Sequence, residues 1–334
     1  MQKLSDYIWL NGEFVPFEDS KIHILNHSLH YGSGVFEGIR CYEAPDGPAV
    51  FRLNDHVKRL FKSAAVMRMD SRLRSSSLSD EAQTSESNDG NDKSSENDGW
   101  GEKDIEGATL EIIRRNNLTE CYIRPLVFFG EKMGLDPKGT EVNVMIAAWP
   151  WGKYLQKEAV KVKISDFTRI HPKSSVMTAK ISGHYANSIL ASTDAKNHGY
   201  DEALLLDYKG NIAEGPGENI FFIKGNQLFT PNKGSILPGI TRATIIEIAQ
   251  RELGLRVKEK DIKPEEIKEF DEAFFVGTAV EVNAIGQINN IRLTGKKEGP
   301  ITKQIRELYL DIVHGKAQGY SKWLSFVSER SLQK

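Results

Sequence analysis

The sequence contains only two cysteines, Cys41 and Cys121, and they do not form a Cys-x-x-Cys pair. This argues against a disulfide framework and a zinc site, and free thiols are typical of a reducing cytoplasm. No run of about 18 apolar residues is present, so we expect no membrane span. Residues 1–7 lack the apolar stretch of a signal peptide. We therefore expect a cytoplasmic protein that contains no metal.

The sequence also lacks the features of several common functional classes. Its formal net charge is −2 and it has no basic stripe, so we expect no nucleic-acid partner. It contains no Gly-x-Ser-x-Gly elbow and no phosphate-binding P-loop. Gly32 to Gly38 resembles a dinucleotide-binding loop but has one residue too many and no preceding parallel strand. His23, His27 and His30 lack a metal-like set of partners and are interpreted as structural histidines.

The length of 334 residues suggests two domains. Pro150 to Gly152 predicts a linker. We place a small N-terminal domain at 1–149, a linker at 150–159 and a large domain at 160–334. Strands and helices mix without a regular βαβ alternation, which predicts an α+β fold.

The apolar spacing predicts individual elements. Asn11-Gly12 between two apolar runs predicts a hairpin turn. Further strands are predicted at 121–129, 142–149, 160–164, 202–206, 219–223, 227–230 and 272–276. Helices are predicted at 54–69, from Ile105, and at 185–198, 242–253 and 302–313.

The segment 71–104 differs from the rest of the chain. It contains nine Ser, nine Asp or Glu and four Lys or Arg, with few apolar residues. Such a composition buries too little apolar surface to offset the entropy lost on ordering. We therefore predict a disordered insert.

Three short motifs carry residues suited to chemistry. Lys180 lies among small and apolar neighbours, where desolvation favours the neutral amine that a Schiff-base lysine requires. Glu214 precedes Gly215-Pro216-Gly217, a rigid backbone that allows close approach, and its carboxylate is suited to a pyridine nitrogen. Leu237 to Arg242 leads into a helix whose first N–H groups and Thr241 hydroxyl are suited to a phosphate.

In their order and spacing these motifs resemble the cofactor site of the class IV pyridoxal 5'-phosphate (PLP) enzymes. Three further segments, 30–40, 122–125 and 277–279, resemble the bacterial branched-chain-amino-acid aminotransferases. The resemblance extends from Tyr7 to about Val327, without 71–104, where family members have a short turn and the start of a helix. It implies fold type IV, with two α/β domains and the cofactor between them.

The resemblance also implies roles for individual residues. Lys180 would bond covalently to PLP and move a proton between the substrate Cα and the cofactor C4′. Glu214 would pair with the ring nitrogen and Tyr185 with O3′, while Asn219 would lie behind both. The residues expected to bind the cofactor, phosphate included, are Arg59, Lys180, Tyr185, Glu214, Asn219, Leu237, Gly239, Ile240, Thr241 and Thr278.

The substrate pocket follows from the same resemblance. Tyr122, Thr278 and Ala279 would bind the α-carboxylate, and Arg124 would support that pocket and admit the side-chain carboxylate of glutamate. The residues expected to line the apolar pocket are Phe36, Gly38, Trp151, Tyr154 and Tyr185. Tyr31 and Leu135 would reach in from a neighbouring subunit of a homodimer or an assembly of dimers.

The implied reaction is PLP-dependent exchange of an amino group between leucine, isoleucine or valine and 2-oxoglutarate. It would give branched-chain 2-oxo acids and L-glutamate. Because a methylene gives only about 1–3 kcal/mol of discrimination, broad branched-chain use is expected. One alternative is a D-amino-acid or amine transaminase of the same fold, against which Tyr122 and Arg124 argue. The other is a PLP-binding protein whose catalysis is impaired by the insert.

Overall fold

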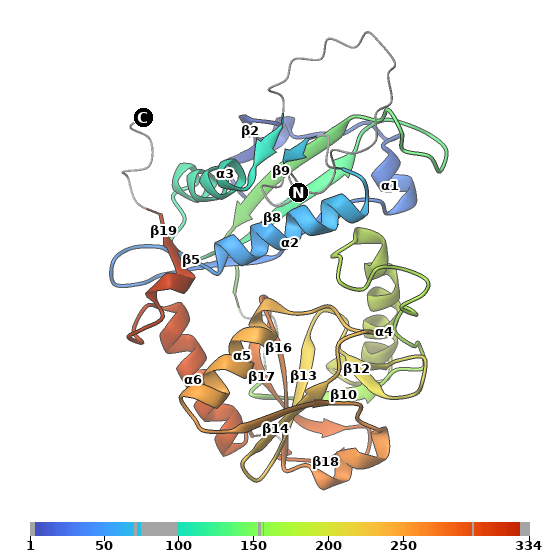
Figure 1. Cartoon of the computed structure of the whole chain (residues 1–334), viewed down its shortest axis with the longest axis vertical. Helices are drawn as coiled ribbons and strands as arrows, with labels where there is room; N and C mark the ends of the chain where they lie inside the picture. The colour runs from blue at the N-terminus through green and yellow to red at the C-terminus, as the bar shows by residue number, and fades with distance from the viewer. Residues whose placement is uncertain are drawn as a thin grey trace, which may run out of the picture.

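The computed structural model describes residues 4–69, 72–74, 99–152, 155, 157–295 and 297–327. Residues 75–98, the greater part of the predicted insert, lie outside the described residues, as does Tyr154. The structure contains two large sheets, one above the other in Figure 1. No helix in the described ranges is both long and apolar enough to cross a membrane.

The first sheet has eight strands in the order β19-β5-β4-β8-β9-β1-β2, with β3 paired to β8. Its strands are β1 (Tyr7–Leu10), β2 (Glu13–Pro16), β3 (Val35–Phe36), β4 (Ile39–Tyr42), β5 (Ala49–Phe51), β8 (Cys121–Phe129), β9 (Val142–Trp149) and β19 (Leu324–Phe326). The predicted hairpin is confirmed: Asn11 and Gly12 have φ angles of 50° and 99°, which join β1 to β2.

Three helices belong to this half: α1 (His27–Tyr31), α2 (Leu53–Val66) and α3 (Glu102–Arg115). The buried side of α2 includes Val57, Leu60 and Phe61, and that of α3 includes Ile105 and Ile112. These side chains form one core with the apolar side chains of β4, β8 and β9.

The prediction of disorder over 71–104 is wrong at both ends of that segment. Leu73, in β6 (Leu73–Arg74), pairs with Trp100, in the parallel strand β7 (Trp100–Gly101). Leu73 is 3% exposed and belongs to the first core, and Trp100 packs against that core. Helix α3 begins at Glu102 rather than Ile105, because Asp104 accepts a hydrogen bond from the Gly101 N–H and caps the first turn. A few apolar contacts at the ends therefore order residues that composition alone assigns to disorder.

The second sheet has nine strands in the order β12-β11-β10-β17-β16-β13-β14-β15, with β18 paired to β17. Its strands are β10 (Ala159–Ile164), β11 (Glu202–Leu206), β12 (Ile212–Glu214), β13 (Asn219–Lys224), β14 (Gln227–Pro231), β15 (Arg256–Lys260), β16 (Glu272–Gly277), β17 (Glu281–Ile288) and β18 (Ile291–Arg292). Parallel and antiparallel pairs occur side by side in this sheet.

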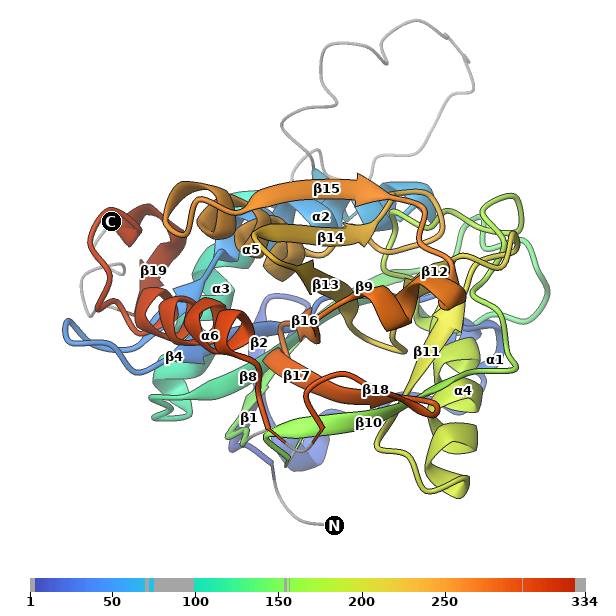
Figure 2. The same ribbon diagram turned by 90° about the horizontal axis from the view of Figure 1, so that it is seen from below.

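Three helices accompany the second sheet: α4 (Tyr185–Asn197), α5 (Ile240–Arg251) and α6 (Pro300–Val313). Viewed from below, the strands run between α6 on one side and α4 on the other (Figure 2). Side chains from β13, β16, α5 and α6 form one core, and a second core includes Phe222, Phe275 and Ile285. Four short 3₁₀ helices, η1 (Phe17–Asp19), η2 (Ser182–His184), η3 (Pro264–Glu269) and η4 (Ser321–Trp323), complete the described elements.

The C-terminal strand returns to the first sheet. After α6 the chain runs through η4 into β19, which pairs antiparallel with β5. Residues 324–326 therefore add a strand to the sheet that the N-terminal half builds. The domain boundary at 150–159 stays a prediction, and the assignment of all of 160–334 to one domain takes no account of this strand.

Candidate active site

A cavity of about 500 Å³ is lined by side chains from both halves of the fold. The sequence-predicted residues that line it are Phe36, Gly38, Arg59, Tyr122, Arg124, Lys180, Tyr185, Glu214, Asn219, Leu237, Gly239, Ile240, Thr241, Thr278 and Ala279. The structure thus brings together residues up to 243 positions apart, from Phe36 to Ala279. A cavity of this size can hold one small molecule.

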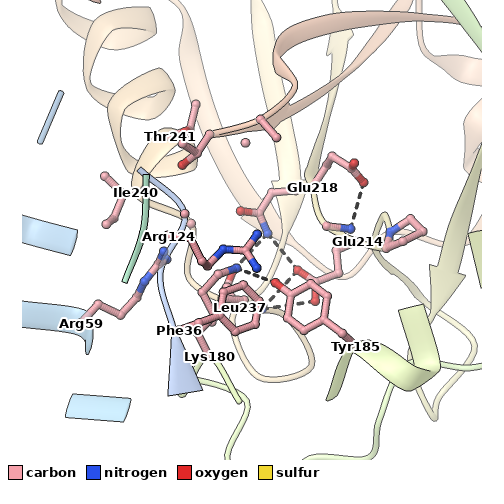
Figure 3. Close-up of a pocket in the computed structure, with 18 of the residues that line it drawn as sticks. Phe36, Arg59, Arg124, Lys180, Tyr185, Glu214, Glu218, Leu237, Ile240 and Thr241 are labelled. Carbon is pink, nitrogen blue, oxygen red and sulfur yellow. Dashed lines mark hydrogen bonds between the residues drawn. The ribbon is translucent and has the colours of Figure 1, made fainter. Parts of the chain in front are cut away.

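Lys180 projects into the cavity from a loop fixed to the first half of the fold. Its backbone N–H donates to the Ser63 hydroxyl in α2 at 3.0 Å, and its carbonyl accepts from the Phe36 N–H at 3.1 Å. Its Nζ donates to the Tyr185 hydroxyl at 2.5 Å and lies 4.9 Å from the centre of the Phe36 ring. Figure 3 shows Lys180 close to Phe36 and Tyr185. The amine is thus held where a molecule in the cavity can meet it.

Glu214 is a buried carboxylate at the end of β12. It accepts hydrogen bonds from Arg169 Nε at 2.7 Å, from Asn219 Nδ2 at 3.1 Å and from the Leu237 N–H at 3.2 Å. Burial raises the pKa of Glu214, and the Arg169 guanidinium opposes that rise. The sequence did not identify Arg169, since it lies 45 residues from Glu214 and outside every motif.

The N-terminus of α5 forms one end of the cavity. Gly239 precedes the helix, and Ile240 and Thr241 form its first turn, where N–H groups have no acceptor within the helix. A Cβ at Gly239 would lie 2.1 Å from the Asn219 side-chain oxygen, so only glycine fits there. The helix was predicted to begin at Arg242 and begins two residues earlier, at Ile240. This turn is suited to an anion.

Arg59 lies at the same end of the cavity and is held by a buried carboxylate. Glu37, with a fully buried side chain, accepts from Arg59 Nε at 2.6 Å and from Arg59 Nη2 at 2.9 Å. Glu37 also contacts His56 Nδ1 at 2.7 Å. Burial opposes ionisation of Glu37, but the Arg59 guanidinium holds the pKa of this carboxyl well below its usual range. No role was predicted for Glu37 or His56 from the sequence. Glu37 lies between the predicted pocket residues Phe36 and Gly38, and His56 lies three residues before Arg59.

Another part of the cavity lining comes from the first sheet. A Cβ at Gly38 would lie 2.0 Å from the Tyr122 hydroxyl oxygen, so glycine is needed for this approach. Arg124 Nη2 lies 3.4 Å from the same hydroxyl, and its guanidinium stacks 4.5 Å from the centre of the Phe36 ring. Thr278 and Ala279, in the turn between β16 and β17, also line the cavity.

Three other predicted substrate residues that the structure describes, Trp151, Tyr31 and Leu135, lie outside the cavity lining. Trp151 packs against Tyr122, which lines the cavity, with 5.2 Å between the two ring centres. Tyr31 and Leu135 are 39% and 83% exposed. They lie near each other, since the Tyr31 hydroxyl accepts from the Gly134 N–H at 3.1 Å. Their predicted role in a neighbouring subunit stays a prediction.

A further buried carboxyl, Glu218, lines the cavity and was not predicted. Its side chain accepts from the Gly217 N–H at 3.0 Å. Burial, together with the nearby carboxylates of Glu202 and Glu214, raises the pKa of Glu218 to about 8. In Figure 3 Glu214 and Glu218 lie apart from the group formed by Arg59, Ile240 and Thr241. The Arg59 guanidinium and the N-terminus of α5 therefore lie in one part of the cavity, and the two buried carboxyl groups lie in another.

Comparison with known proteins identifies the family. The family model described as amino-transferase class IV matches residues 34–288. The branched-chain-amino-acid aminotransferase of Pseudomonas aeruginosa is 42% identical, over 96% of this chain and 97% of its own length. The solved branched-chain aminotransferase of Thermoproteus uzoniensis with norvaline has a TM-score of 0.85 and 38% identity, over 97% and 100% of the two chains.

A second solved structure is informative about the ligand. The T.th. branched-chain amino acid aminotransferase, complexed with N-(5'-phosphopyridoxyl)-L-glutamate, has a TM-score of 0.85 and 37% identity. The match covers 97% of this chain and 99% of that one. Sequence, fold and cavity agree, and this chain belongs to the class IV aminotransferases.

Proposed function

We propose that this chain is a PLP-dependent transaminase. It exchanges an amino group between branched-chain L-amino acids and 2-oxoglutarate, giving branched-chain 2-oxo acids and L-glutamate. The observation that carries this proposal is one cavity with three features: the Lys180 amine, the buried Glu214 carboxylate and the N-terminus of α5. The relatives named above are branched-chain aminotransferases, which supports the choice of substrate.

The residues of the cavity fit PLP. Gly239 allows the Asn219 side chain to pack directly against the backbone that leads into α5, and the N–H groups of the first turn of that helix have no acceptor within the helix. Arg59, Ile240, Thr241 and Thr278 would hold the phosphate, and Glu214 would hold the ring nitrogen in its protonated state. When bound, PLP supplies an electron sink for negative charge at the substrate α-carbon.

The other roles in the reaction belong to residues of the chain itself. Lys180 Nζ would hold the cofactor covalently and would move the proton at the substrate α-carbon, a general acid–base task. Tyr185 orients the Lys180 amine through the 2.5 Å hydrogen bond. Arg169 and Asn219 keep the Glu214 carboxylate in one orientation. Tyr122, with Thr278 and Ala279, would bind the α-carboxylate, while Phe36 and Gly38 would shape the apolar side of the pocket.

We also propose that the chain acts in the cytoplasm as a homodimer or an assembly of dimers, with Tyr31 and Leu135 completing the neighbouring site. Their exposure in one chain supports this arrangement, since an apolar side chain 83% exposed is a candidate for a contact.

An amino-donor panel tests the function. Purified protein with PLP is incubated with 2-oxoglutarate and leucine, isoleucine, valine, D-leucine or a primary amine, and both the amount and the configuration of the glutamate formed are measured. We expect turnover with the three L-amino acids. Turnover confined to D-leucine or the amine would favour the alternative transaminase, and PLP binding without turnover would favour the impaired protein.

A further inference from the structure

A buried ion pair connects the two sheets near the cavity. Arg40, in β4 of the first sheet, contacts Glu281, at the start of β17 in the second sheet, with 2.9 Å between Nη1 and Oε1. The two side chains are 8% and 20% exposed. Neither belongs to the described residues that line the cavity. The pair therefore acts on the cavity only through neighbouring residues.

Arg40 lies beside Tyr122 in the first sheet. It is directly opposite Tyr122 across the β4–β8 ladder, and opposite residues of an antiparallel pair project from the same face. Gly38, against which the Tyr122 hydroxyl rests, is two residues before Arg40. The Arg40 guanidinium also lies 4.9 Å from the centre of the Tyr42 ring. These contacts fix the charged group to the first sheet.

Glu281 closes the turn that carries Thr278 and Ala279. It pairs with Gly277 across the β16–β17 hairpin, so the residues between them form the turn. The φ angle of Glu281 is 58°, in the left-handed region that side chains other than glycine rarely adopt. A strained residue of this kind persists where its surroundings hold it. The contact to Arg40 is a charge-assisted hydrogen bond able to do so.

We propose that the Arg40–Glu281 pair is a positioning device, which fixes the Thr278–Ala279 turn relative to Tyr122 and so sets the geometry that binds a substrate carboxylate. This rests on the proposed function, in which those three residues bind that carboxylate. The charges of the pair offset each other, so its effect on a bound carboxylate is through position. Loss of either partner frees the turn and weakens carboxylate binding.

Two single variants change the local charge in opposite directions. Glu281→Gly removes the acid and suits the positive φ angle. Arg40→Met removes the base and keeps an unbranched apolar side chain of similar reach. If charge alone mattered, Glu281→Gly would strengthen carboxylate binding and Arg40→Met would weaken it. If position matters, both weaken it, and the double variant is no worse than either single variant.

Binding to the PLP-loaded enzyme is measured by calorimetry with 4-methylvaleric acid, which has no amino group to react, and with its neutral amide. We expect each single variant and the double variant to raise the Kd of the acid by roughly tenfold, the size that a small misplacement of binding groups can produce. The Kd of the amide should rise less than that of the acid, because hydrogen bonds to a neutral carbonyl oxygen are weaker than hydrogen bonds to a carboxylate. Opposite shifts in the two single variants, or an unchanged Kd for the acid, would overturn the proposal.

Arg306→Met is the matched control. Arg306, in α6, contacts Glu298 at 2.8 Å, and the Glu298 side chain is 6% exposed. This variant also breaks a partly buried ion pair but should leave both Kd values unchanged. An equal rise of the acid Kd in Arg306→Met would mean that general loosening is the cause, and would count against the proposal.

The wild-type protein separates this proposal from the proposed function. Wild-type binding of the acid without turnover of L-amino acids would reject the function and leave the variants interpretable. Turnover with unshifted Kd values in the variants would reject only the positioning role. Failure of the wild type to bind the acid would reject both.

Discussion

At the scale of single residues, Lys180 is the position on which the proposed chemistry depends most. Its peptide unit is held by Ser63 and Phe36, and its amine by Tyr185. Lys180→Ala should therefore abolish transamination, a loss of at least about a thousandfold, because covalent attachment and proton transfer are lost together. Single-turnover formation of 2-oxo acid from leucine measures this directly.

Lys173→Ala is the matched control, since Lys173 is exposed and lies seven residues away in the same loop. It should keep wild-type turnover. Borohydride reduction of the PLP-loaded enzyme, followed by peptide mapping, should label Lys180, and a label on another lysine would contradict the assignment.

Glu218 gives a prediction for the dependence of stability on pH. Its pKa is raised from 4.5 to about 8, chiefly by burial. Between these values the folded protein keeps a proton that the unfolded chain releases, so this residue lowers stability as pH rises from about 4.5 to 8. Glu218→Gln removes that dependence and can still accept the Gly217 hydrogen bond. Its gain in free energy of unfolding over wild type should grow between pH 5 and pH 8, to roughly 1–3 kcal/mol.

Thermal unfolding of both proteins at several pH values measures this gain. Exposed Glu265→Gln serves as the control and should show no gain that grows with pH. A constant difference between Glu218→Gln and wild type across the range would show that Glu218 does not hold a proton in the folded state.

The sequence identified residues whose motif is local and missed their distant partners. Glu214 was found because two glycines and a proline follow it closely. Arg169 was missed because only the fold brings it to 2.7 Å from Glu214. Glu37 was missed as the partner of Arg59 for the same reason. The sequence around a single acid in a glycine-rich segment does not indicate which arginine the fold places next to it.

At the scale of elements, the strands with long apolar runs were predicted well, and a strand whose apolar pattern is interrupted was not. The strands at 121–129 and 142–149 match β8 and β9 because their apolar runs are long. Strand β17 was missed, and Gly286 within it gives a physical reason. A Cβ there would lie 1.5 Å from the Gly295 carbonyl oxygen, so the strand must carry a glycine that weakens its pattern.

The two ends of the 71–104 segment give a prediction about stability. Leu73 is 3% exposed and pairs with Trp100, whose ring centre is 5.3 Å from that of Trp9. Leu73→Ala should lower the free energy of unfolding by about 2–4 kcal/mol, because it leaves a cavity in the first core. Chemical denaturation with an unchanged m-value is the measurement.

Two deletions locate the stabilising contacts within this segment. Removal of 71–104 takes away Leu73 and Trp100 and should destabilise the protein. Replacement of 75–98 alone by a short glycine-serine linker should keep the melting temperature and PLP binding, since loop closure depends only weakly on length. Equal stability after the two deletions would show that Leu73 and Trp100 contribute nothing.

At the scale of the whole molecule, the sequence predicted the α+β class and the fold type but not the order of the strands. The pairing of β19 with β5 joins residues more than 270 positions apart. Neither strand has more than three residues, so no pattern in either one indicates its partner. Long-range pairings of this kind are settled by the packing of the complete chain.

The oligomeric state gives the last prediction, because one chain does not bring Tyr31 and Leu135 into its own cavity lining. If both residues complete the site of a neighbouring subunit, each active site combines Lys180 of one subunit with Tyr31 of the other. Tyr31→Ala and Lys180→Ala then remove groups that different subunits contribute to a site. Each variant alone should have low activity. Mixed after dissociation and reassociation, they should regain about a quarter of the wild-type sites, because half of the dimers are mixed and each of these has one intact site. Light scattering should show dimers or larger assemblies throughout. Activity in the mixture no higher than the mean of the two variants, or an active monomer, would place Tyr31 outside any shared site.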